Sequence, residues 1–329
     1  MKLRSRIYVI GRKIWRKMYA TVIEKVRPAD LPYEGTIAQV TPLIIEHPSI
    51  LKKVIQPERG EVRARKSKLT IELWSRGRVD YCNVLLASFL SQSYTEWDLT
   101  FLEDFDQNYE DDPIFPRLLK LIKERGHKVI FLKPRSYLGC VKSAIEVMKE
   151  TETEYAMKMD DDHYFEPNAF EELVNVLEKN KSFGAIGGML YPIGVESFER
   201  KEHIPRDFNK WSGPNKRIWN DYSTRTSIYP SQVVEVDFVR APFMYRASEL
   251  HKANFLEDYG NAGYSPMAFR IESEICNTLK KKYGYKTVIH TGVVMWHFAS
   301  SSGGCRMIDQ NASIHDDNVY YKRWEEFHK

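Results

Sequence analysis

Three consecutive carboxylates stand in the middle of the chain, in the segment MKMDDDHYFEP. Asp160, Asp161 and Asp162 come directly after an apolar segment, and His163 follows them. Adjacent carboxylates repel one another, so a cation or hydrogen-bond donors must offset the repulsion. Carboxylate oxygens suit Mg²⁺ or Mn²⁺, which complete their shells with water and substrate phosphates. The triplet predicts a divalent metal site, and a solvated acidic turn that caps the following helix is the alternative.

The elements around the triplet predict an α/β fold. Strand and helix signals alternate from Lys68 onward, as in a parallel sheet with crossover helices. Ligands bind such sheets at the carboxyl ends of the strands, where the triplet falls. We expect strands at 69–75, 98–104, 128–133, 154–160, 184–192 and 286–298, helices at 79–93, 116–126, 139–150, 168–180 and 273–284, and a long irregular stretch at 192–235.

Composition excludes several classes of protein. The 329 residues are 43% hydrophobic and 29% charged, which is ordinary for a globular chain and excludes a disordered protein or a membrane bundle. A net charge of +4 is too small to indicate a nucleic-acid partner. The four cysteines show no CxxC spacing, which argues against a zinc site and a disulfide-stapled secreted module and favours a reducing cytoplasm. No apolar run reaches the roughly 20 residues of a spanning helix.

The N-terminal residues 1–27 place apolar side chains at helical spacing among basic ones. This pattern predicts a cationic amphipathic helix that lies on an anionic membrane surface or docks on the catalytic body. We therefore expect a cytoplasmic, peripheral protein. The domain division that follows is an N-terminal helix and connection at 1–66, a nucleotide-sugar-binding half at 67–191, an acceptor half at 192–299 and a C-terminal loop and segment at 300–329.

Three stretches of the chain, taken together, resemble the family-2 glycosyltransferases of the GT-A fold, over roughly residues 67–300. They are LTIELWSRGRVDYCNVLLASFLSQSYTEWDLTFLEDFD, YLGCVKSAIEVMKETETEYAMKMDDDHYFEP and RIESEICNTLKKKYGYKTVIHTGVVMWH. The resemblance implies a Rossmann-like mixed sheet flanked by helices, here with an N-terminal helical extension. It also implies transfer of a sugar, with inversion, from a nucleotide-diphosphate donor to a saccharide, lipid-linked or protein acceptor.

The resemblance also implies roles for individual residues around the donor. Asp162 would coordinate Mn²⁺ or Mg²⁺, and Asp160 and His297 are further candidate ligands. The nucleotide-sugar would contact residues at the ends of the first, second and fourth strands and one residue of the third helix: Ser75, Arg76, Glu103, Asp104, Lys142, Asp160 and Asp161.

The general base is implied at Glu272 or at Glu274. The family usually shows Glu-Asp-x-Asp, whereas this chain has Ile271 before Glu272, so either glutamate remains a candidate. Two surface acids in the first turn of a helix are the alternative, because the helix dipole favours them there. Two rival functions are nucleotidyl transfer and a catalytically silent sugar-nucleotide-binding protein at a membrane surface. Nucleotidyl transfer usually brings a Gly-rich loop near the first strand, but the loop SRGRVD has a single glycine.

Overall fold

The computed structural model of the chain describes residues 66–103, 108–134, 138–192, 232–266, 270–298 and 310–327. They belong to one compact unit, Lys66–Lys329. The basic helix expected at 1–27 and most of the irregular stretch expected at 192–235 lie outside the described residues. Within the described ranges, no helix has the length and apolar character needed to cross a bilayer.

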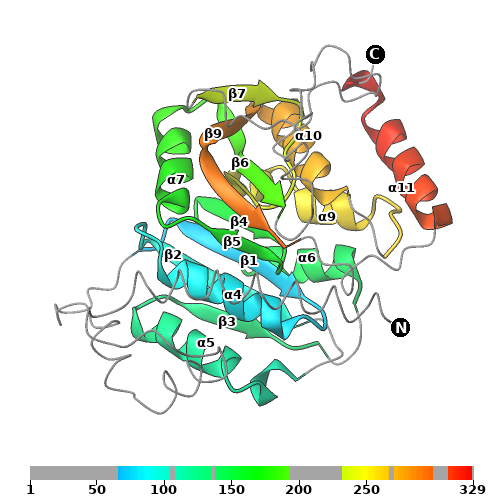
Figure 1. Cartoon of the computed structure of the whole chain (residues 1–329). Coiled ribbons are helices and arrows are strands. Elements are labelled where there is room, and N and C mark those ends of the chain that lie inside the picture. The colour runs from blue at the N-terminus through cyan, green and yellow to red at the C-terminus, as the bar shows by residue number, and fades with distance from the viewer. Residues whose placement is uncertain are drawn as a thin grey trace, which may run out of the picture. The chain divides into compact units, whose positions relative to one another are not determined.

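A mixed β-sheet forms the centre of this unit (Figure 1). Its described strands run in the order β3-β2-β1-β4-β8-β6-β9-β5, and β7 pairs with β9. Strands β1 to β4 are mutually parallel, and antiparallel β8 joins them to the parallel pair of β6 and β9. The strands are β1 (Leu69–Ser75), β2 (Trp97–Glu103), β3 (Val129–Leu132), β4 (Tyr155–Met159), β5 (His163–Phe165), β6 (Phe183–Pro192), β7 (Val233–Val236), β8 (Phe243–Arg246) and β9 (Lys286–His297).

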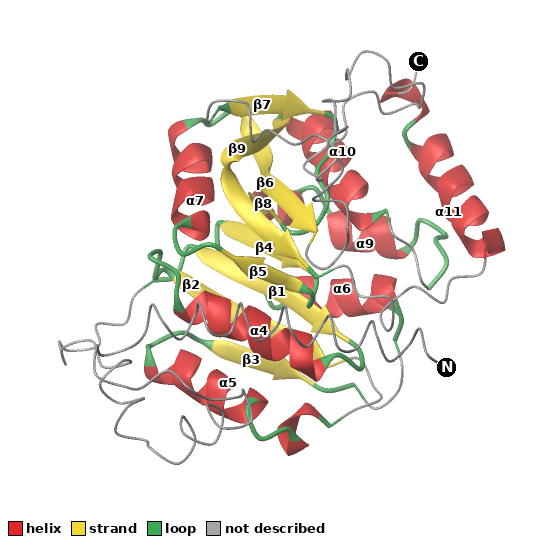
Figure 2. Ribbon diagram, in the orientation of Figure 1, coloured by secondary structure: helices red, strands yellow, loops and turns green. Residues whose placement is uncertain are grey.

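Helices cover both faces of the sheet (Figure 2). One apolar cluster is built with α4 (Val79–Leu90), α5 (Phe115–Glu124) and α7 (Ala169–Lys179). A second is built with α6 (Cys140–Lys149), α8 (Ala247–Lys252), α9 (Phe255–Gly260) and α10 (Ile271–Tyr283). The remaining described helices are α11 (Gln310–Arg323) and the short 3₁₀ turns η1 (Tyr109–Asp111) and η6 (Glu325–Phe327).

Strand β1 alternates apolar and polar side chains from Leu69 to Leu73. Leu69, Ile71 and Leu73 belong to the cluster with α4, α5 and α7, because alternate side chains of a strand point to the same face. Thr70 and Glu72 alternate with them and are also buried, since helices cover the second face as well. The strand expected at 69–75 has these bounds in the structure, and the mixed α/β architecture is confirmed.

The segment after the acidic triplet differs from the helix cap considered as an alternative. His163–Phe165 forms the short strand β5, which pairs antiparallel with the end of β9. Helix α7 begins later, at Ala169, with Asn168 at its N-cap position. The triplet therefore sits in a tight connection between β4 and β5. Strands from both expected halves, 67–191 and 192–299, share one sheet, and the boundary between those halves stays a prediction.

The cysteines differ from the sequence-based expectation in one respect. Cys82 and Cys276 are free and buried. Cys140, the first residue of α6, is disulfide-bonded. The spacing of the cysteines does not predict this bond, and disulfides are rare in a reducing cytoplasm. The cellular compartment stays a prediction.

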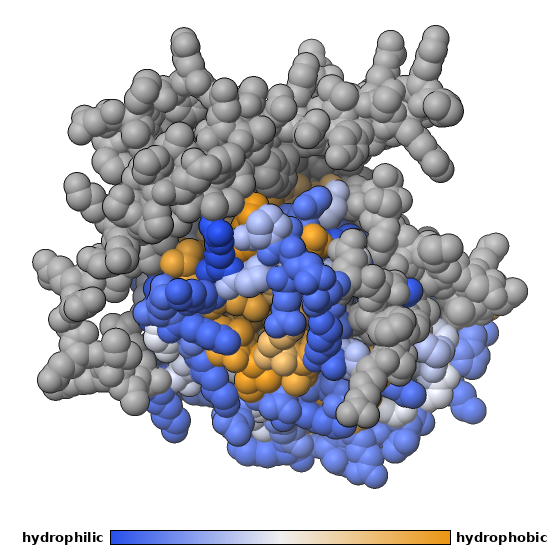
Figure 3. Space-filling view, turned by 90° about the horizontal axis from the view of Figure 1, so that it is seen from below, coloured by the Kyte–Doolittle hydropathy of each residue, from blue (hydrophilic) through white to orange (hydrophobic). Residues whose placement is uncertain are grey.

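The face seen from below, where α5 and β3 lie in Figure 1, is mostly hydrophilic over its described part, with one apolar area near its middle (Figure 3). Strand β3 is the edge strand on this side, and all four of its apolar residues are half-buried. The acidic triplet belongs instead to the connection that follows β4.

Candidate active site

The carboxyl ends of three neighbouring parallel strands meet at the edge of the sheet that carries the triplet. Ser75, the last residue of β1, is paired in register with Glu103, the last residue of β2. On the other side of β1, Leu73 pairs with Met159, the last residue of β4. Because these strands are parallel, the residues that follow Met159 emerge beside Ser75. This is the edge at which open α/β sheets bind ligands.

Two basic side chains pair with the three carboxylates of the triplet. Asp160 accepts a hydrogen bond from Lys158 Nζ at 2.7 Å. Asp161 accepts one from Arg78 Nε at 3.1 Å, and Asp162 accepts one from Arg78 Nη1 at 2.9 Å. The side chains of Lys158 and Arg78 thus offset part of the mutual repulsion of the three acids.

Asp161 is part of a buried chain of hydrogen bonds. Its carboxylate also accepts a hydrogen bond from Ser75 Oγ and contacts Arg78 Nη2. The Ser75 hydroxyl in turn lies 2.7 Å from the Tyr109 hydroxyl, which accepts a hydrogen bond from the Arg78 backbone N–H at 2.9 Å. Burial raises the pKa of Asp161, and Arg78 opposes that shift. This chain fixes the loop after β1 against the triplet.

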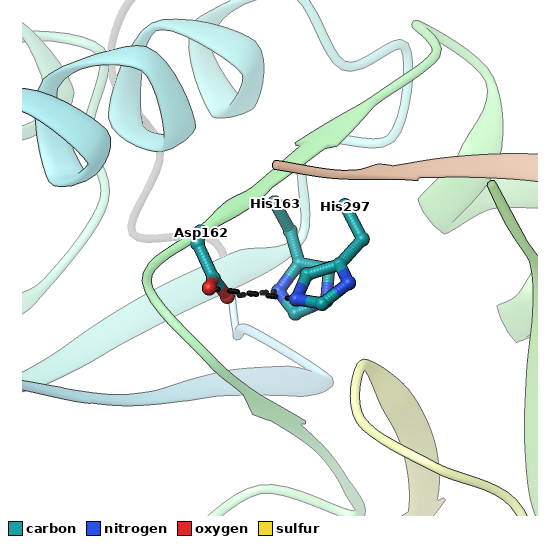
Figure 4. A group of neighbouring side chains, drawn as sticks. All are labelled: Asp162, His163 and His297. Carbon is teal, nitrogen blue, oxygen red and sulfur yellow. Dashed lines mark ion pairs between the residues drawn. The ribbon is translucent and has the colours of Figure 1, made fainter. Parts of the chain in front are cut away.

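Asp162, His163 and His297 form the one group of side chains in the described residues that could hold a metal ion (Figure 4). Each offers one ligand atom, and these atoms lie within 4.8 Å of one another. The β5–β9 register explains the cluster, since it places His163 directly opposite His297, and opposite residues of antiparallel strands lie side by side. The two rings stack with centroids 4.9 Å apart, and His297 Nε2 lies 3.4 Å from Asp162 Oδ2.

The chemistry of this group suits a divalent cation. His163 Nδ1 lies 3.0 Å from the Asp160 carbonyl oxygen, and Nε2 is buried with no hydrogen-bond partner among the described residues. A ring that donates from Nδ1 presents a lone pair at Nε2, as metal-binding histidines do. Burial and the neighbouring His297 lower the pKa of His163 to about 4, so the ring is neutral at pH 7. Burial opposes ionisation of Asp162, but His297, His163 and Arg78 hold its pKa below the ordinary value.

Glu272 and Glu274 point to different surroundings. Glu272 Oε1 accepts a hydrogen bond from Lys158 Nζ at 2.8 Å, and its side chain is 16% exposed. Glu274 is fully buried and accepts hydrogen bonds from Arg323 Nε at 3.1 Å and Trp324 Nε1 at 2.8 Å. Glu274 therefore holds the C-terminal segment. Glu272 lies near the triplet instead, because Glu272 and Asp160 both contact Lys158.

The other residues expected around the donor differ in burial and in location. Glu103 is buried at the end of β2, accepts a hydrogen bond from the Tyr109 backbone N–H at 3.2 Å and has a pKa raised by burial. Arg76 is half-buried in the loop after β1, and Lys142 is exposed on α6. Asp104 lies outside the described residues. The group that could hold an ion does not include Asp160, which faces Lys158 instead.

Sequence reasoning missed three residues that the structure brings to this edge. Arg78 stands in the same loop as Arg76, and only the fold shows that Arg78 contacts the triplet. His163 follows the triplet directly in the sequence, but this position alone does not indicate that it is a ligand. Lys158 is a charged residue inside an otherwise apolar strand. Because a buried lysine needs a partner of opposite charge, this feature of the sequence could have identified Lys158 as a residue of the site.

The chain is similar to known proteins in sequence and in structure. A family model described as Glycosyl transferase family 2 matches residues 77–244, just over half of the chain. The chain is similar to the solved structure of S. aureus TarS 1–349 in complex with UDP, at 13% identity over 71% of this chain and 61% of that chain, with a TM-score of 0.45. The TarS 1–349 structure with UDP-GlcNAc gives 12% identity over 74% and 61%, with a TM-score of 0.49. The chain thus spans about three fifths of those structures, and no curated protein matches the sequence.

Proposed function

Because this chain belongs to the family 2 glycosyltransferases, we propose that it transfers a sugar from a nucleoside-diphosphate donor to an acceptor hydroxyl, with a divalent cation at Asp162. The observation that carries the proposal is the cluster of Asp162, His163 and His297 at the carboxyl edge of the sheet. A diphosphate is a poor leaving group unless its charge is neutralised, and this edge offers both a candidate cation site and Arg78.

The cation would be held by Asp162, His163 and His297, with Mn²⁺ or Mg²⁺ as the candidates. Such an ion acts as a Lewis acid on phosphate oxygens and as a template for the leaving group. His163 and His297 add nitrogen ligands to the expected carboxylate. Mn²⁺ tolerates imidazole ligands better than Mg²⁺ does, so the donor set favours Mn²⁺.

The donor would lie along the ends of β1, β2 and β4. Ser75 and Glu103 are side by side there, and Asp160 is half-exposed beside them. Asp160 and Arg76 keep part of their surface exposed and would contact the nucleoside and the sugar, together with the expected Asp104 and Lys142, whereas the buried Ser75, Glu103 and Asp161 would hold this edge in place beneath the donor. We add Arg78, because a guanidinium next to the candidate cation site is placed to contact a pyrophosphate.

We propose Glu272 as the general base and assign Glu274 a structural role. A base must reach the acceptor hydroxyl, and the Glu272 side chain is 16% exposed, whereas Glu274 is fully buried. In the transfer step, the acceptor oxygen forms a bond to the anomeric carbon as its proton passes to Glu272. The bond to the diphosphate oxygen breaks, and its electron pair leaves with the diphosphate. One displacement of this kind inverts the anomeric configuration.

The acceptor would be a saccharide, a lipid-linked sugar or a protein, and nucleic acid is not an expected partner. The basic residues 1–27 would bring the enzyme to an anionic membrane surface on the cytoplasmic side. Vesicle flotation with and without anionic lipid, using the full chain and a chain that starts at residue 28, tests this part separately. Equal flotation of both chains would contradict it.

Release of nucleoside diphosphate from a panel of UDP-, GDP- and dTDP-sugars, with Mn²⁺ or with chelator, tests the transferase proposal. We expect turnover with Mn²⁺ for at least one diphosphate donor and loss of at least about 100-fold in Asp162→Ala. Glu272→Gln should lower kcat by about 10² to 10⁴ with little change in donor KM. Glu152→Gln, an exposed change, is the matched control.

Three outcomes would contradict parts of the proposal. Full activity of Asp162→Ala would remove Asp162 from the site. Donor binding without any release of nucleoside diphosphate would favour the catalytically silent binding protein. Release of pyrophosphate from a nucleoside triphosphate and a sugar phosphate would favour nucleotidyl transfer.

A further inference from the structure

Lys158 is a buried cation in the middle of strand β4. Its side chain is 4% exposed, and its Nζ lies 2.7 Å from Asp160 Oδ1 and 2.8 Å from Glu272 Oε1. The same nitrogen lies 5.1 Å from the centroid of the Trp74 ring. Burial opposes the charged form, but the carboxylates of Asp160 and Glu272 raise the pKa of Lys158 above its ordinary value. The Lys158 ammonium group is thus held between two carboxylates under the site.

The position of Lys158 follows from the alternation of β4. Tyr155, Met157 and Met159 point into the apolar cluster with α4, α5 and α7. Lys158 points to the opposite face, the side on which α10 packs, where the first turn of α10 carries Glu272. A lysine costs several kcal/mol at such a buried position unless its charge is fully paired. Core packing alone would favour an apolar residue at this position. The presence of an ammonium group must therefore be explained by the groups with which it pairs.

We infer that Lys158 is a positioning residue that fixes the Glu272 carboxylate at the edge of the triplet. It joins the end of β4 to the start of α10, two segments that are 114 residues apart in sequence. A glutamate has three side-chain torsions, and the Lys158 hydrogen bond to Oε1 restricts them. The second oxygen, Oε2, is then left to accept the proton of the acceptor. This inference rests on the proposed function, in which Glu272 is the base.

The ammonium group has a second effect on the triplet. By pairing with Asp160, it separates that carboxylate from the group of Asp162, His163 and His297 that could hold an ion. Lys158 therefore keeps Asp160 apart from the candidate cation site, to which Asp162 belongs. Without it, Asp160 and Glu272 would be two partly buried carboxylates with no cation between them, and they would repel each other.

A double-mutant cycle tests whether Lys158 acts through Glu272. Full-length wild type, Lys158→Met, Glu272→Gln and the double variant are compared by kcat and KM for release of nucleoside diphosphate from UDP-GlcNAc, or from the sugar nucleotide that turns over best. We expect Lys158→Met to lower kcat by about 100-fold, because a misplacement of about 1 Å at a reacting group costs that much. In the Glu272→Gln background the loss of kcat should be at least about 10-fold smaller, whereas any change in donor KM, which reports on Asp160, should be equal in both backgrounds.

The outcomes separate this inference from the proposed function. If Glu272→Gln leaves kcat unchanged, the base assignment fails, and the role of Lys158 fails with it. If Glu272→Gln lowers kcat but Lys158→Met lowers it by the same factor in both backgrounds, the base stands and Lys158 is merely structural. Thermal midpoints are measured for all four proteins. If Lys158→Met does not fold, Lys158→Arg replaces it, with a smaller loss of kcat expected only where Glu272 is present.

Discussion

Glu72 gives the structure a pH-dependent stability that can be calculated and measured. Its side chain is fully buried in β1, where Oε2 accepts a hydrogen bond from the Tyr245 hydroxyl at 2.6 Å and Oε1 accepts one from Thr151 Oγ1 at 2.7 Å. Burial raises the pKa of Glu72 from 4.5 to about 7, against the effect of these two donors and of Lys158. The folded protein therefore retains the Glu72 proton in a range where the unfolded chain releases it.

The sign and size of the effect follow from the two pKa values. Between pH 4.5 and about 7 the folded state binds more protons at Glu72 than the unfolded state does, so the free energy of unfolding falls as pH rises. The loss is complete above about pH 7. At 1.36 kcal/mol for each pKa unit, it amounts to about 3 kcal/mol in all, and to roughly 2 to 3 kcal/mol between pH 5 and pH 8.

Glu72→Gln keeps the shape of the side chain and mimics the protonated acid. Both proteins are unfolded with urea at pH 5, 6, 7 and 8. The free energy of unfolding of the variant, minus that of wild type, should rise by roughly 2 to 3 kcal/mol from pH 5 to pH 8. Any hydrogen-bond change caused by the amide is independent of pH and cancels in this comparison. Glu152→Gln, which alters an 82% exposed glutamate, should keep the wild-type slope. Parallel stability curves for wild type and Glu72→Gln would refute the reasoning.

Two further predictions concern the supports of the site. Gly139 has φ +83 and ψ 164, and a Cβ added there would lie 2.7 Å from the Pro266 carbonyl oxygen, so Gly139→Ala should lower the free energy of unfolding by about 2 kcal/mol or more. Gly284→Ala, with φ +69 in open space, should cost only about 1 kcal/mol, and an equal loss would contradict the close contact. Arg323→Met should lower the free energy of unfolding by about 1 to 3 kcal/mol, because the substitution leaves the buried Glu274 carboxylate without its cation. Lys322→Met, an exposed change on the same helix, should cost under about 0.5 kcal/mol if this pairing is the cause.

The central elements could be predicted from sequence because their signals are local. Leu69, Ile71 and Leu73 alternate with polar residues, which is the period of a strand, and Leu69–Ser75 forms β1 with the expected bounds. The triplet was expected at the carboxyl end of a strand, and it follows β4 directly. The family assignment is confirmed by the family model over residues 77–244, and the mixed sheet is confirmed by the strand order.

The histidine pair could not be predicted, because it depends on strand pairing between distant residues. His163 and His297 are brought together by β5, a strand of three residues that carries no periodic signal of its own. His297 was a candidate ligand only through the resemblance, and nothing local in the sequence indicated that His163 would face it. The contact between Arg78 and the triplet also depends on tertiary structure, here on the loop after β1.

Glu272 and Glu274 show how the structure distinguishes two residues that look equivalent in sequence. Residues two apart on a helix are separated by about 200° around its axis, so they do not face the same neighbour. Glu272 meets Lys158 and the end of β4, whereas Glu274 meets Arg323 and the C-terminal segment. Since α10 carries both, the contact that buries Glu274 also holds the helix turn that presents Glu272. The C-terminal segment thereby supports the proposed base from behind, while Lys158 supports it from the sheet.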